Sequence, residues 1–420
     1  MLSKQVPLAE VHVARRTRKS RLLADLKTKR KLRLPVEAPA VRKIRKKRRV
    51  LAEVPAELTT RSKKEQGTPT AVCLLFTMSY FSFQWHITEE CDQRCKHCYI
   101  YALGSHAKFK MMSLSDMDKV LSNIENFAKK SGRTPYLYIT GGDPILHPQF
   151  WELLEKIHIK GYRVAILGNP FHITEENAKR MRDLGVVKYQ LSLDGLKETH
   201  DKIRQVGSYD ATIKTVPVLQ SAGIQVAIMA TVSKWNVKEI PLLVDEVVKA
   251  NADVFAFARY CPSVEDRDVC CSPQEYREML AACDKKFKQY AGGNTYFSKK
   301  DHLWTLYDYE NGKFNPKDYP DDEIVYGGCN CGNAHFTILS DGACYACRRM
   351  ESKVGNALTD DLYDLFTCEK MDEYRIYEKF EKCAKCPLLR FCRGCPAVSF
   401  GYSGGNMYAP DPECWFKIQE

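Results

Sequence analysis

"CDQRCKHCY", residues 91–99, places three cysteines at the spacing C-x3-C-x2-C. A structural metal site normally closes with four ligands, whereas a site that acts on a bound molecule keeps one position open. The nearest further ligand type, His97, falls inside the C-x2-C turn, where it does not easily reach the same ion. Cys91, Cys95 and Cys98 therefore favour an iron–sulfur cluster with one open iron, and a structural zinc ion is the alternative.

This stretch directly follows the first of six predicted strands. Short runs rich in β-branched and aromatic residues suit strands that are buried on both faces. These runs are residues 83–88, 136–140, 163–168, 188–193, 225–232 and 254–258. The amphipathic segments between them predict helices, and three of these helices end at a glycine (Gly161, Gly185 and Gly223). Six strand–helix units predict an α/β fold, a partial (β/α)6 TIM-like barrel.

Polar or glycine-rich groups follow every predicted strand. The active site of a parallel βα fold gathers at the carboxyl ends of its strands. The groups at these ends are the cysteine loop (residues 91–99), "GGDP" (141–144), "GNP" (168–170), "SLDG" (192–195), Thr231 with Ser233, and Arg259. A scaffold that only packs does not need such residues, so the sequence predicts an active site at this edge of the barrel.

Cysteines are abundant in a chain without an export signal. The 420 residues include 18 cysteines but neither a secretory signal nor an apolar run long enough to span a bilayer. We therefore expect reduced, metal-binding thiols and a cytoplasmic protein that does not contact membranes. Six scattered cysteines are expected to pack as small buried hydrophobes: Cys73, Cys261, Cys270, Cys271, Cys283 and Cys368.

Positive charge is concentrated near the start of the chain. Residues 1–70 carry 21 Lys and Arg against 6 Asp and Glu, whereas the whole chain has a formal net charge of +12. This tail is predicted to be disordered, or to precede a true start at Met78, and the alternatives are a nucleic-acid arm or a binder of an acidic peptide. The predicted organisation is a tail at 1–77, a barrel core at 78–290, a turn-rich connector at 291–326 and a cysteine-rich unit at 327–420. Metal clusters are expected to supply part of the core of that last unit.

The pair of motifs "CDQRCKHCY" and "GGDP" resembles the radical S-adenosylmethionine (SAM) superfamily. In that family the three-cysteine loop holds a [4Fe–4S] cluster, and the open iron binds the amino and carboxylate groups of SAM. The resemblance implies that Cys91, Cys95 and Cys98 are the ligands of the catalytic cluster. It also implies reductive cleavage of SAM to a 5′-deoxyadenosyl radical, which abstracts a hydrogen atom from the substrate.

The resemblance extends to residues that would contact SAM near the cysteine loop. His97 occupies the loop position beside the adenine, where the family usually has an aromatic residue. Gly141, Gly142 and Asp143 match a Gly-Gly-Glu-type motif that meets the amino group of SAM. Asp143 is shorter than the usual Glu but stays within the pattern.

Further contacts to SAM are implied at later strand ends. Asn169 is expected to belong to the cofactor site, and Ser192 and Asp194 match a strand end that contacts SAM, with Ser192 favoured for the ribose. Arg204 resembles a contact to the carboxylate, which a guanidinium fork suits. Ordinary turn, cap or surface roles are the alternatives for Ser192, Asp194 and Arg204.

The C-terminal cysteines resemble the SPASM extension, which carries auxiliary iron–sulfur clusters. The resemblance assigns one cluster to Cys383, Cys386, Cys392 and Cys414. The other would take Cys347, Cys395 and two of Cys329, Cys331 and Cys344, with Cys344 expected to be spare. The spacing from Cys392 to Cys395 is C-x2-C where the family has C-x3-C, and zinc-ribbon-like sites are the alternative.

SPASM-containing radical SAM proteins mostly modify peptides, so the resemblance implies a maturase that acts on a ribosomally made precursor peptide. Arg348, directly after Cys347, argues against the sulfatase-maturing subclass, which has an acidic base at that position. The alternatives are an enzyme for a small molecule or cofactor precursor, or a nucleic-acid-binding metalloprotein, which is the less favoured. The expected partner besides the precursor peptide is an electron donor of the flavodoxin or ferredoxin type. Because residues 1–77 lack a leader-binding pattern, leader binding is expected to be absent, to be done by the barrel itself, or to need a separate leader-binding protein.

Overall fold

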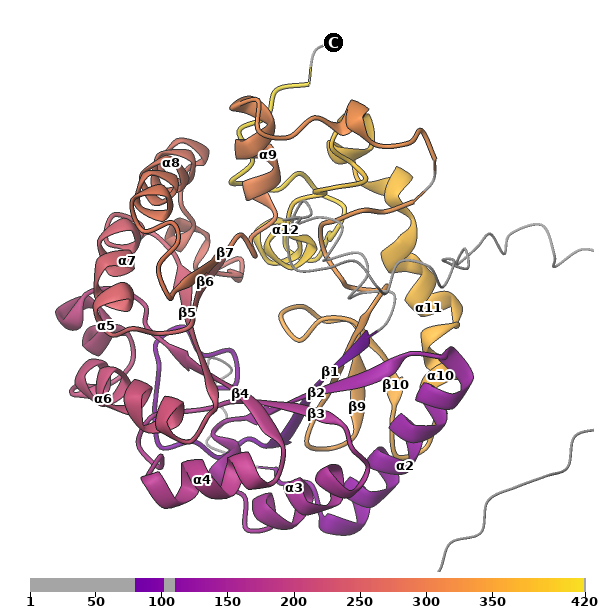
Figure 1. Cartoon of the computed structure of the whole chain (residues 1–420). Helices are drawn as coiled ribbons and strands as arrows, with labels where there is room; N and C mark the ends of the chain where they lie inside the picture. Colours follow the sequence, from indigo (N-terminus) through magenta and orange to yellow (C-terminus); the bar gives the residue numbers. More distant parts are fainter. Residues whose placement is uncertain (1–79, 102–109, 323, 419–420) are drawn as a thin grey trace, which may run out of the picture. The chain divides into compact units, whose positions relative to one another are not determined.

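The computed structural model describes residues 80–101, 110–322 and 324–418, so the predictions about the tail at 1–77 lie outside the described residues. The described strands form one ten-stranded sheet in the order β10-β9-β8-β1-β2-β3-β4-β5-β6-β7 (Figure 1). The strands are β1 (Tyr80–Thr88), β2 (Thr134–Gly141), β3 (Arg163–Leu167), β4 (Val186–Ser192), β5 (Gln225–Val232), β6 (Val254–Arg259), β7 (Tyr296–Ser298), β8 (His335–Ile338), β9 (Ala343–Tyr345) and β10 (Lys353–Asn356).

Helices alternate with strands β1 to β6 and continue into the C-terminal region. The helices are α2 (Leu114–Ser131), α3 (Phe150–Ile159), α4 (Glu175–Asp183), α5 (Lys197–Ile203), α6 (Ser208–Ser221), α7 (Ile240–Lys249), α8 (Pro273–Gln289), α9 (Leu303–Glu310), α10 (Leu362–Phe366), α11 (Glu369–Asp372) and α12 (Pro396–Ser403). Short 3-10 turns are η3 (Pro144–Leu146), η4 (Arg267–Val269), η5 (Pro316–Asp318), η6 (Glu373–Arg375), η7 (Tyr377–Lys379) and η8 (Cys383–Lys385).

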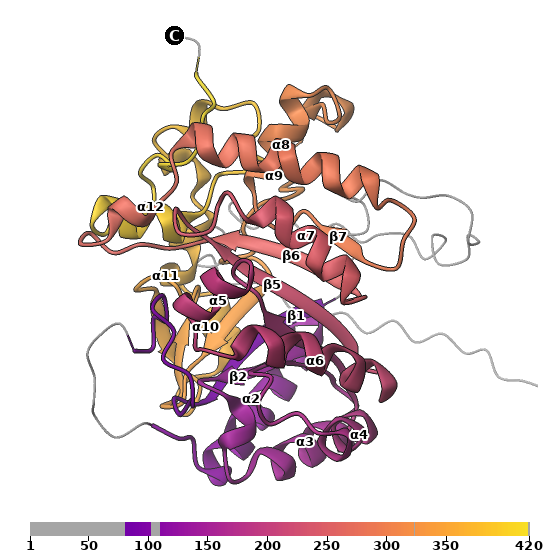
Figure 2. The same ribbon diagram turned by 90° about the vertical axis from the view of Figure 1, so that its left-hand side faces the viewer.

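The six predicted strands correspond to β1–β6, and each pairs in parallel with its neighbour in sequence order. The sheet curves, and helices α2 to α8 cover its outer side (Figures 1 and 2). Because the strand order ends at β10 on one side and β7 on the other, the sheet does not close. The prediction of a partial barrel is therefore confirmed.

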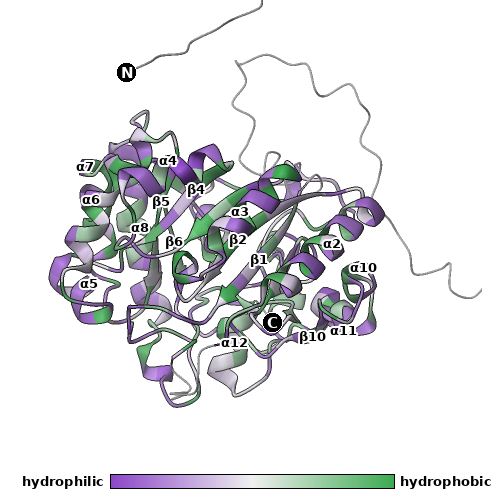
Figure 3. Ribbon diagram, turned by 90° about the horizontal axis from the view of Figure 1, so that it is seen from below, coloured by the Kyte–Doolittle hydropathy of each residue, from purple (hydrophilic) through white to green (hydrophobic). Residues whose placement is uncertain are grey.

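Strand β1 carries apolar and polar side chains on opposite faces. Phe81, Phe83, Trp85 and Ile87 are fully buried, and the rings of Phe81 and Phe127 of α2 lie 4.5 Å apart. The alternating residues, such as Gln84, point to the opposite side, which is the interior of the barrel. The outer layer is thus built from the apolar faces of helices whose other faces are hydrophilic, as the alternating colours of Figure 3 illustrate.

Local signals fix where the helices begin and end. The Ser113 hydroxyl accepts from the Asp116 backbone N–H at the start of α2, and Ser272 and Glu275 form a reciprocal capping box at the start of α8. The three glycines predicted to end helices have positive φ values of 69° (Gly161), 85° (Gly185) and 80° (Gly223). These helix ends were therefore predicted correctly from the sequence.

The structure differs from the prediction of a turn-rich connector at residues 291–326. This segment contains strand β7, which pairs in parallel with β6, and helix α9. The cysteine-rich region also joins the sheet, because β8 pairs in parallel with β1. The sequence did not reveal these pairings because β7 is only three residues long and its partner is distant in the chain. Among the described residues, no helix is both long and apolar enough to cross a membrane.

Candidate active site

The cysteine loop (residues 91–99) follows β1 and is tied to two other parts of the barrel. The Lys96 backbone N–H donates to the Ile203 carbonyl at 2.8 Å. Gln93, which is buried, donates from Nε2 to the Ser208 hydroxyl at 3.0 Å. These bonds hold the loop against the end of α5 and the start of α6, with its three cysteines half-buried.

The surroundings of the loop thiols suit metal ligation. Asn169 Nδ2 donates to Cys91 Sγ at 3.3 Å, and Arg204 Nη1 lies 3.8 Å from Cys95 Sγ. Burial raises the pKa of the Cys91 thiol to about 12 and also raises the pKa of Cys95. A thiolate here therefore needs a strong positive partner, which iron provides. Asn169, predicted as a cofactor contact, thus lies against a predicted ligand thiol.

The "GGDP" motif packs directly against the cysteine loop. The backbone N–H groups of Gly142 and Asp143 donate to the carbonyls of Thr88 and Glu90 at 2.9 and 2.7 Å. A Cβ at Gly141 would lie 2.1 Å from the Thr88 oxygen, and one at Gly142 would lie 2.0 Å from the Glu90 oxygen. Both positions therefore require glycine, because the two backbones touch.

Asp143 presents a buried carboxylate beside this contact. Its Oδ1 accepts from the Asn169 backbone N–H at 3.4 Å, while its buried Oδ2 has no hydrogen-bond partner among the described residues. Burial raises the pKa of Asp143 to about 7, and the Asn169 backbone N–H only partly opposes this. An unsatisfied carboxylate oxygen next to the cysteine loop fits an ammonium group such as the one SAM carries.

Asp194 and Arg204 pair with each other. Arg204 Nε donates to Asp194 Oδ2 at 2.5 Å, and the Thr231 backbone N–H donates to Asp194 Oδ1 at 2.8 Å. Burial opposes ionisation, but the Arg204 guanidinium and His97 hold the pKa of Asp194 at about 2. Burial lowers the pKa of His97 to about 4, so this ring is neutral at pH 7 although its Nε2 lies 3.5 Å from Asp194 Oδ2. All three residues lie at the cysteine loop, as the sequence predicted.

Two residues at this end of the barrel were not predicted from the sequence. Asp92 accepts from Asn169 Nδ2 at 2.6 Å through one oxygen, and its other oxygen lies 2.9 Å from His172 Nε2. Asp92 therefore positions the Asn169 amide that contacts Cys91. Its place inside the cysteine loop was the available signal, whereas nothing in the sequence linked His172 to the loop. Ser192, predicted to meet the ribose, is the half-buried last residue of β4.

Cys329, Cys331, Cys347 and Cys395 form auxiliary group 1. The Cys331 backbone N–H donates to Cys329 Sγ at 3.4 Å, and burial, followed by the neighbouring Cys329 and Cys395, raises the pKa of the Cys347 thiol. The Cys395 backbone N–H donates to Asp411 Oδ2 at 2.8 Å, which fixes this cysteine. Cys344, expected to be spare, lies fully buried on β9 with its Sγ 3.7 Å from the Gly342 carbonyl oxygen.

Two further residues join auxiliary group 1. Cys261 packs against the core, as predicted, but it also lies beside the Cys395 thiol and 3.8 Å from Arg349 Nη1. The tertiary fold brings Cys261, in the loop after β6, close to Cys395. No local sequence motif predicts this proximity. Burial lowers the pKa of His302, but the hydrogen bond to Cys329 outweighs it and the pKa is raised.

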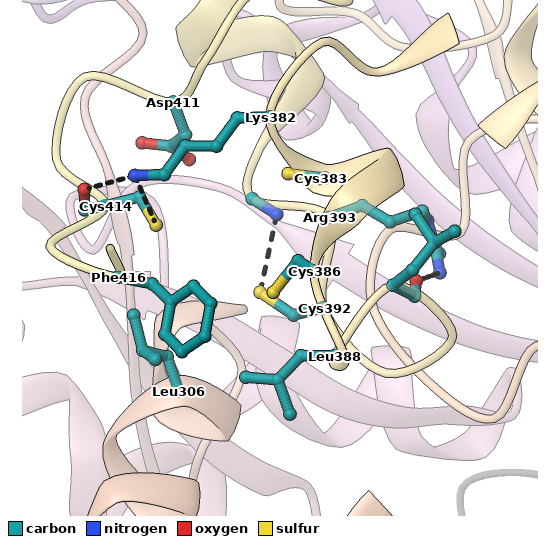
Figure 4. A pocket seen from close by; sticks show the side chains of 12 residues that line it. Leu306, Lys382, Cys383, Cys386, Leu388, Cys392, Arg393, Asp411, Cys414 and Phe416 are labelled. Atoms are coloured by element: carbon teal, nitrogen blue, oxygen red, sulfur yellow. Dashed lines mark hydrogen bonds between the residues drawn. The ribbon is translucent and has the colours of Figure 1, made fainter. Parts of the chain in front are cut away.

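Cys383, Cys386, Cys392 and Cys414 form auxiliary group 2 and line one pocket (Figure 4). Lys382 Nζ lies 3.5 Å from Cys414 Sγ, and the Gly394 backbone N–H donates to Cys392 Sγ at 3.4 Å. Leu306, Leu388 and Phe416 supply an apolar wall. Four cysteines around a shared pocket fit a fully ligated cluster.

A tight turn explains the shortened spacing between Cys392 and Cys395. The two residues between them, Arg393 and Gly394, both have positive φ values, 85° and 63°. Arg393 also donates through Nη2 to the Gly327 carbonyl at 2.9 Å, which stabilises a conformation that is uncommon for a non-glycine residue. The turn sends Cys392 to auxiliary group 2 and Cys395 to auxiliary group 1.

Comparison with known proteins identifies two domains in this chain. Two family models match: the radical SAM superfamily over residues 85–247 and the SPASM iron–sulfur cluster-binding domain over residues 329–396. The chain is 26% identical over 363 residues to the AdoMet-dependent heme synthase of Nitratidesulfovibrio vulgaris, covering 84% of this chain and 94% of that protein. It is also 26% identical over 362 residues to the mycofactocin maturase MftC of Mycobacterium tuberculosis, covering 83% of this chain and 84% of that protein. The crystal structure of Streptococcus suis SuiB bound to its precursor peptide SuiA has a TM-score of 0.65 and 20% identity, covering 86% of this chain and 85% of that one.

The chain therefore belongs to the radical SAM superfamily, and the cysteine-rich region that follows its barrel is a SPASM domain. Both predicted resemblances are confirmed, as is the combination of a partial barrel with a C-terminal SPASM domain. The protein is a radical SAM enzyme, and its cofactors are SAM and [4Fe–4S] clusters.

Proposed function

We propose that this radical SAM enzyme oxidises a peptide substrate in the barrel interior, between the cysteine loop and auxiliary group 1. SAM bound at the cysteine-loop cluster supplies the 5′-deoxyadenosyl radical that takes a hydrogen atom from the substrate. A cluster held by auxiliary group 1 would supply a nearby electron acceptor for the oxidation of the substrate. We infer that Cys91, Cys95 and Cys98 hold the first cluster and that Asp143 binds the ammonium group of SAM.

One contact carries this proposal. Arg348 directly follows Cys347 of auxiliary group 1, and its guanidinium carbon lies 4.4 Å from the centre of the Tyr99 ring. Tyr99 directly follows Cys98 of the cysteine loop. Two neighbouring side chains thus connect the two cysteine sets. A substrate that touches both would be within reach of the radical at one end and of an electron acceptor at the other.

A peptide is the first candidate substrate. MftC is a maturase that aligns over most of this chain, and SuiB, which shares the fold, is known in a complex with its precursor peptide. We propose the predicted partners on the same basis: a precursor peptide, a flavodoxin- or ferredoxin-type electron donor and a separate leader-binding protein. A cytoplasmic location fits this chemistry.

A cofactor precursor is the second candidate. The alignment with the AdoMet-dependent heme synthase covers nearly all of that protein, which favours a small molecule of the tetrapyrrole class. The two candidates predict different products from the same enzyme. Mass spectrometry of both substrates therefore distinguishes the two candidates, because only the true substrate changes mass. SAM cleavage is expected in both cases and does not distinguish them.

The test uses anaerobically purified full-length protein, reductant and SAM. It is incubated in parallel with a short peptide encoded beside its gene and with a metalloporphyrin carrying propionate side chains. Loss of hydrogen mass from the peptide, together with substrate-dependent 5′-deoxyadenosine, would support the first candidate. A changed porphyrin with an unchanged peptide would replace it with the second.

A further inference from the structure

The barrel interior lacks acidic side chains on its strands. None of the ten described strands contains Asp or Glu. The residues in register with Gln84 across β2, β3 and β4 are Tyr138, Ala165 and Lys188, so these share its inward face. Lys188 is half-buried, and burial followed by the charge of Arg163 lowers its pKa. At this level the wall of the interior therefore carries one cation, Lys188, and no acidic side chain.

Three more cations lie between this wall and auxiliary group 1: Lys300, Arg348 and Arg349. Lys300 keeps solvent contact, yet the surrounding protein, then Arg349 and Lys188, lower its pKa to about 8. Arg349 Nη1 donates to the Arg259 carbonyl at 3.0 Å. Arg348 covers the Tyr99 ring, and its buried Nε has no hydrogen-bond partner in the described part of the chain.

Among the residues that the structure describes, these cations have no carboxylate partners. Across the described ranges, no Asp or Glu oxygen lies within 4.0 Å of the charged nitrogens of Lys188, Lys300, Arg348 or Arg349. The nearby Arg259 differs, because it is fully buried and forms ion pairs with three carboxylates. These partners are Asp301 at 2.9 Å, Asp411 at 2.6 Å and Glu413 at 3.2 Å.

Positive charge without a carboxylate partner attracts anionic ligands, and it does so more strongly where burial removes part of its hydration, as at the half-buried Lys188 and Arg348. The fold supplies carboxylates to Arg259 but not to the other four cations, of which Arg349 instead lies 3.8 Å from the Cys261 thiol. Guanidinium groups match the planar, bidentate geometry of carboxylates, and a lysine adds a point charge. A ligand that carries carboxylates therefore complements this region.

We propose that Lys300 and Arg348, with Arg349 and Lys188 behind them, form a binding site for carboxylate groups of the substrate. The site specifies the substrate class, which is molecules that carry carboxylates. This proposal rests on the function proposed above. The site would hold the substrate by its carboxylates beside Tyr99, between the cysteine loop and auxiliary group 1. A peptide carboxylate and a propionate of a small molecule offer the same chemistry.

The experiment measures binding to the anaerobic holoprotein with SAM and without reductant, so it does not depend on turnover. Two matched pairs of probes are compared. N-acetyltyrosine and its amide represent a peptide end, and mesoporphyrin IX and its dimethyl ester represent a small dicarboxylate. The free carboxylate should bind about tenfold or more tightly than its neutral partner in at least one pair, because a charged hydrogen bond contributes about 1.5–3 kcal/mol. The pair that shows the preference identifies the source of the carboxylate.

Variants locate the preference in the proposed site. Lys300→Gln and Arg348→Gln should each remove most of it, and Arg348→Lys should restore part of it. Lys299→Gln is the matched control, because the neighbouring Lys299 is an exposed residue whose Nζ forms an ion pair with Asp308 at 2.6 Å. This control should keep the full preference.

Three results would overturn the proposal. One is equal binding of carboxylate and neutral probes in both pairs. Another is an equal loss of preference in the Lys299→Gln control. The third is an unchanged preference in Lys300→Gln and Arg348→Gln together with altered electron paramagnetic resonance signals of the auxiliary clusters, which would assign these cations to the clusters. Because no turnover is required, a failure to oxidise peptides would leave the binding result intact.

Discussion

Gly142 is a residue at which the contact between two segments leaves no room for a methyl group. Because a Cβ would lie 2.0 Å from the Glu90 oxygen, Gly142→Ala should push the cysteine loop away from the "GGDP" motif. We expect at least about a tenfold loss of SAM affinity, since one displaced hydrogen bond to a charged group already costs about 1.5 kcal/mol. Equilibrium dialysis of labelled SAM checks this. Gly293→Ala is the control, because the nearest atom to its Cβ would be 3.2 Å away.

Asp143 should make SAM binding depend on pH. Its pKa is raised to about 7 by burial, so the carboxyl is neutral below that pH and charged above it. The positively charged amino group of SAM needs the charged form, so SAM affinity should rise as the pH increases from about 6 to 8. In Asp143→Asn the affinity should be lower and flat over this range. A parallel pH dependence in both proteins would contradict the assignment of Asp143.

Linkage gives Asp143 an opposite effect on folding. Its folded pKa lies above the usual value of 3.8 for an Asp, so its contribution to stability is greatest at low pH and is lost as the pH rises through about 7. The protein without SAM should therefore lose some stability as the pH rises from about 3.8 to about 7. SAM should offset the loss, because its ammonium group pairs with the charged carboxylate.

Many residues of the candidate site could be predicted from the sequence because their motifs are local. Cys91, Cys95 and Cys98 lie within eight positions, and "GGDP" directly follows β2. Asp194 and Arg204 were found as separate candidates, but their 2.5 Å pairing could not be read from the chain. The proximity of Cys261 to Cys395 was not predicted, because it arises only from the tertiary fold.

Arg259, the last residue of β6, lies in a buried cluster of charged side chains that connects the barrel to the C-terminal region. Arg259→Met should leave Asp301, Asp411 and Glu413 without their counter-charge, which costs about 3–5 kcal/mol when one partner of a buried ion pair is lost. The thermal unfolding midpoint of the anaerobic holoprotein should fall by several degrees. Arg277→Met is the matched control, since Arg277 forms an exposed pair with Glu310 and should cost about 1 kcal/mol or less. Equal effects of the two substitutions would refute the role given to this cluster.

The turn between Cys392 and Cys395 separates the cysteines of the two auxiliary groups. A Cβ at Gly394 would lie 2.5 Å from Asp411 Oδ2, and the residue has a positive φ of 63°. Gly394→Ala should therefore separate the two cysteines and remove iron from the auxiliary groups, while the cysteine loop keeps its own. Iron analysis combined with electron paramagnetic resonance measures this. Full iron content in the variant would show that the turn is dispensable.

At the scale of the whole molecule, the βα rhythm was sufficient to predict the open barrel. The strand boundaries are set by apolar runs and the helix ends by glycines, which are both local signals. The pairing of β8 with β1 and of β7 with β6 was not predictable, because short strands carry little pattern and their partners are far away in sequence. These pairings extend the sheet at both edges, and β8 and β9 lie in the chain between Cys331 and Cys347 of auxiliary group 1.

The most direct test of the account is SAM cleavage by the cysteine-loop cluster. Anaerobically purified protein should contain about twelve iron atoms per chain, if each of three clusters holds four, and should form 5′-deoxyadenosine when reduced with SAM. The variant with Cys91, Cys95 and Cys98 all changed to Ala should lose about a third of the iron and all of this product. Product formation by that variant, or parent protein that contains zinc in place of iron, would contradict the account.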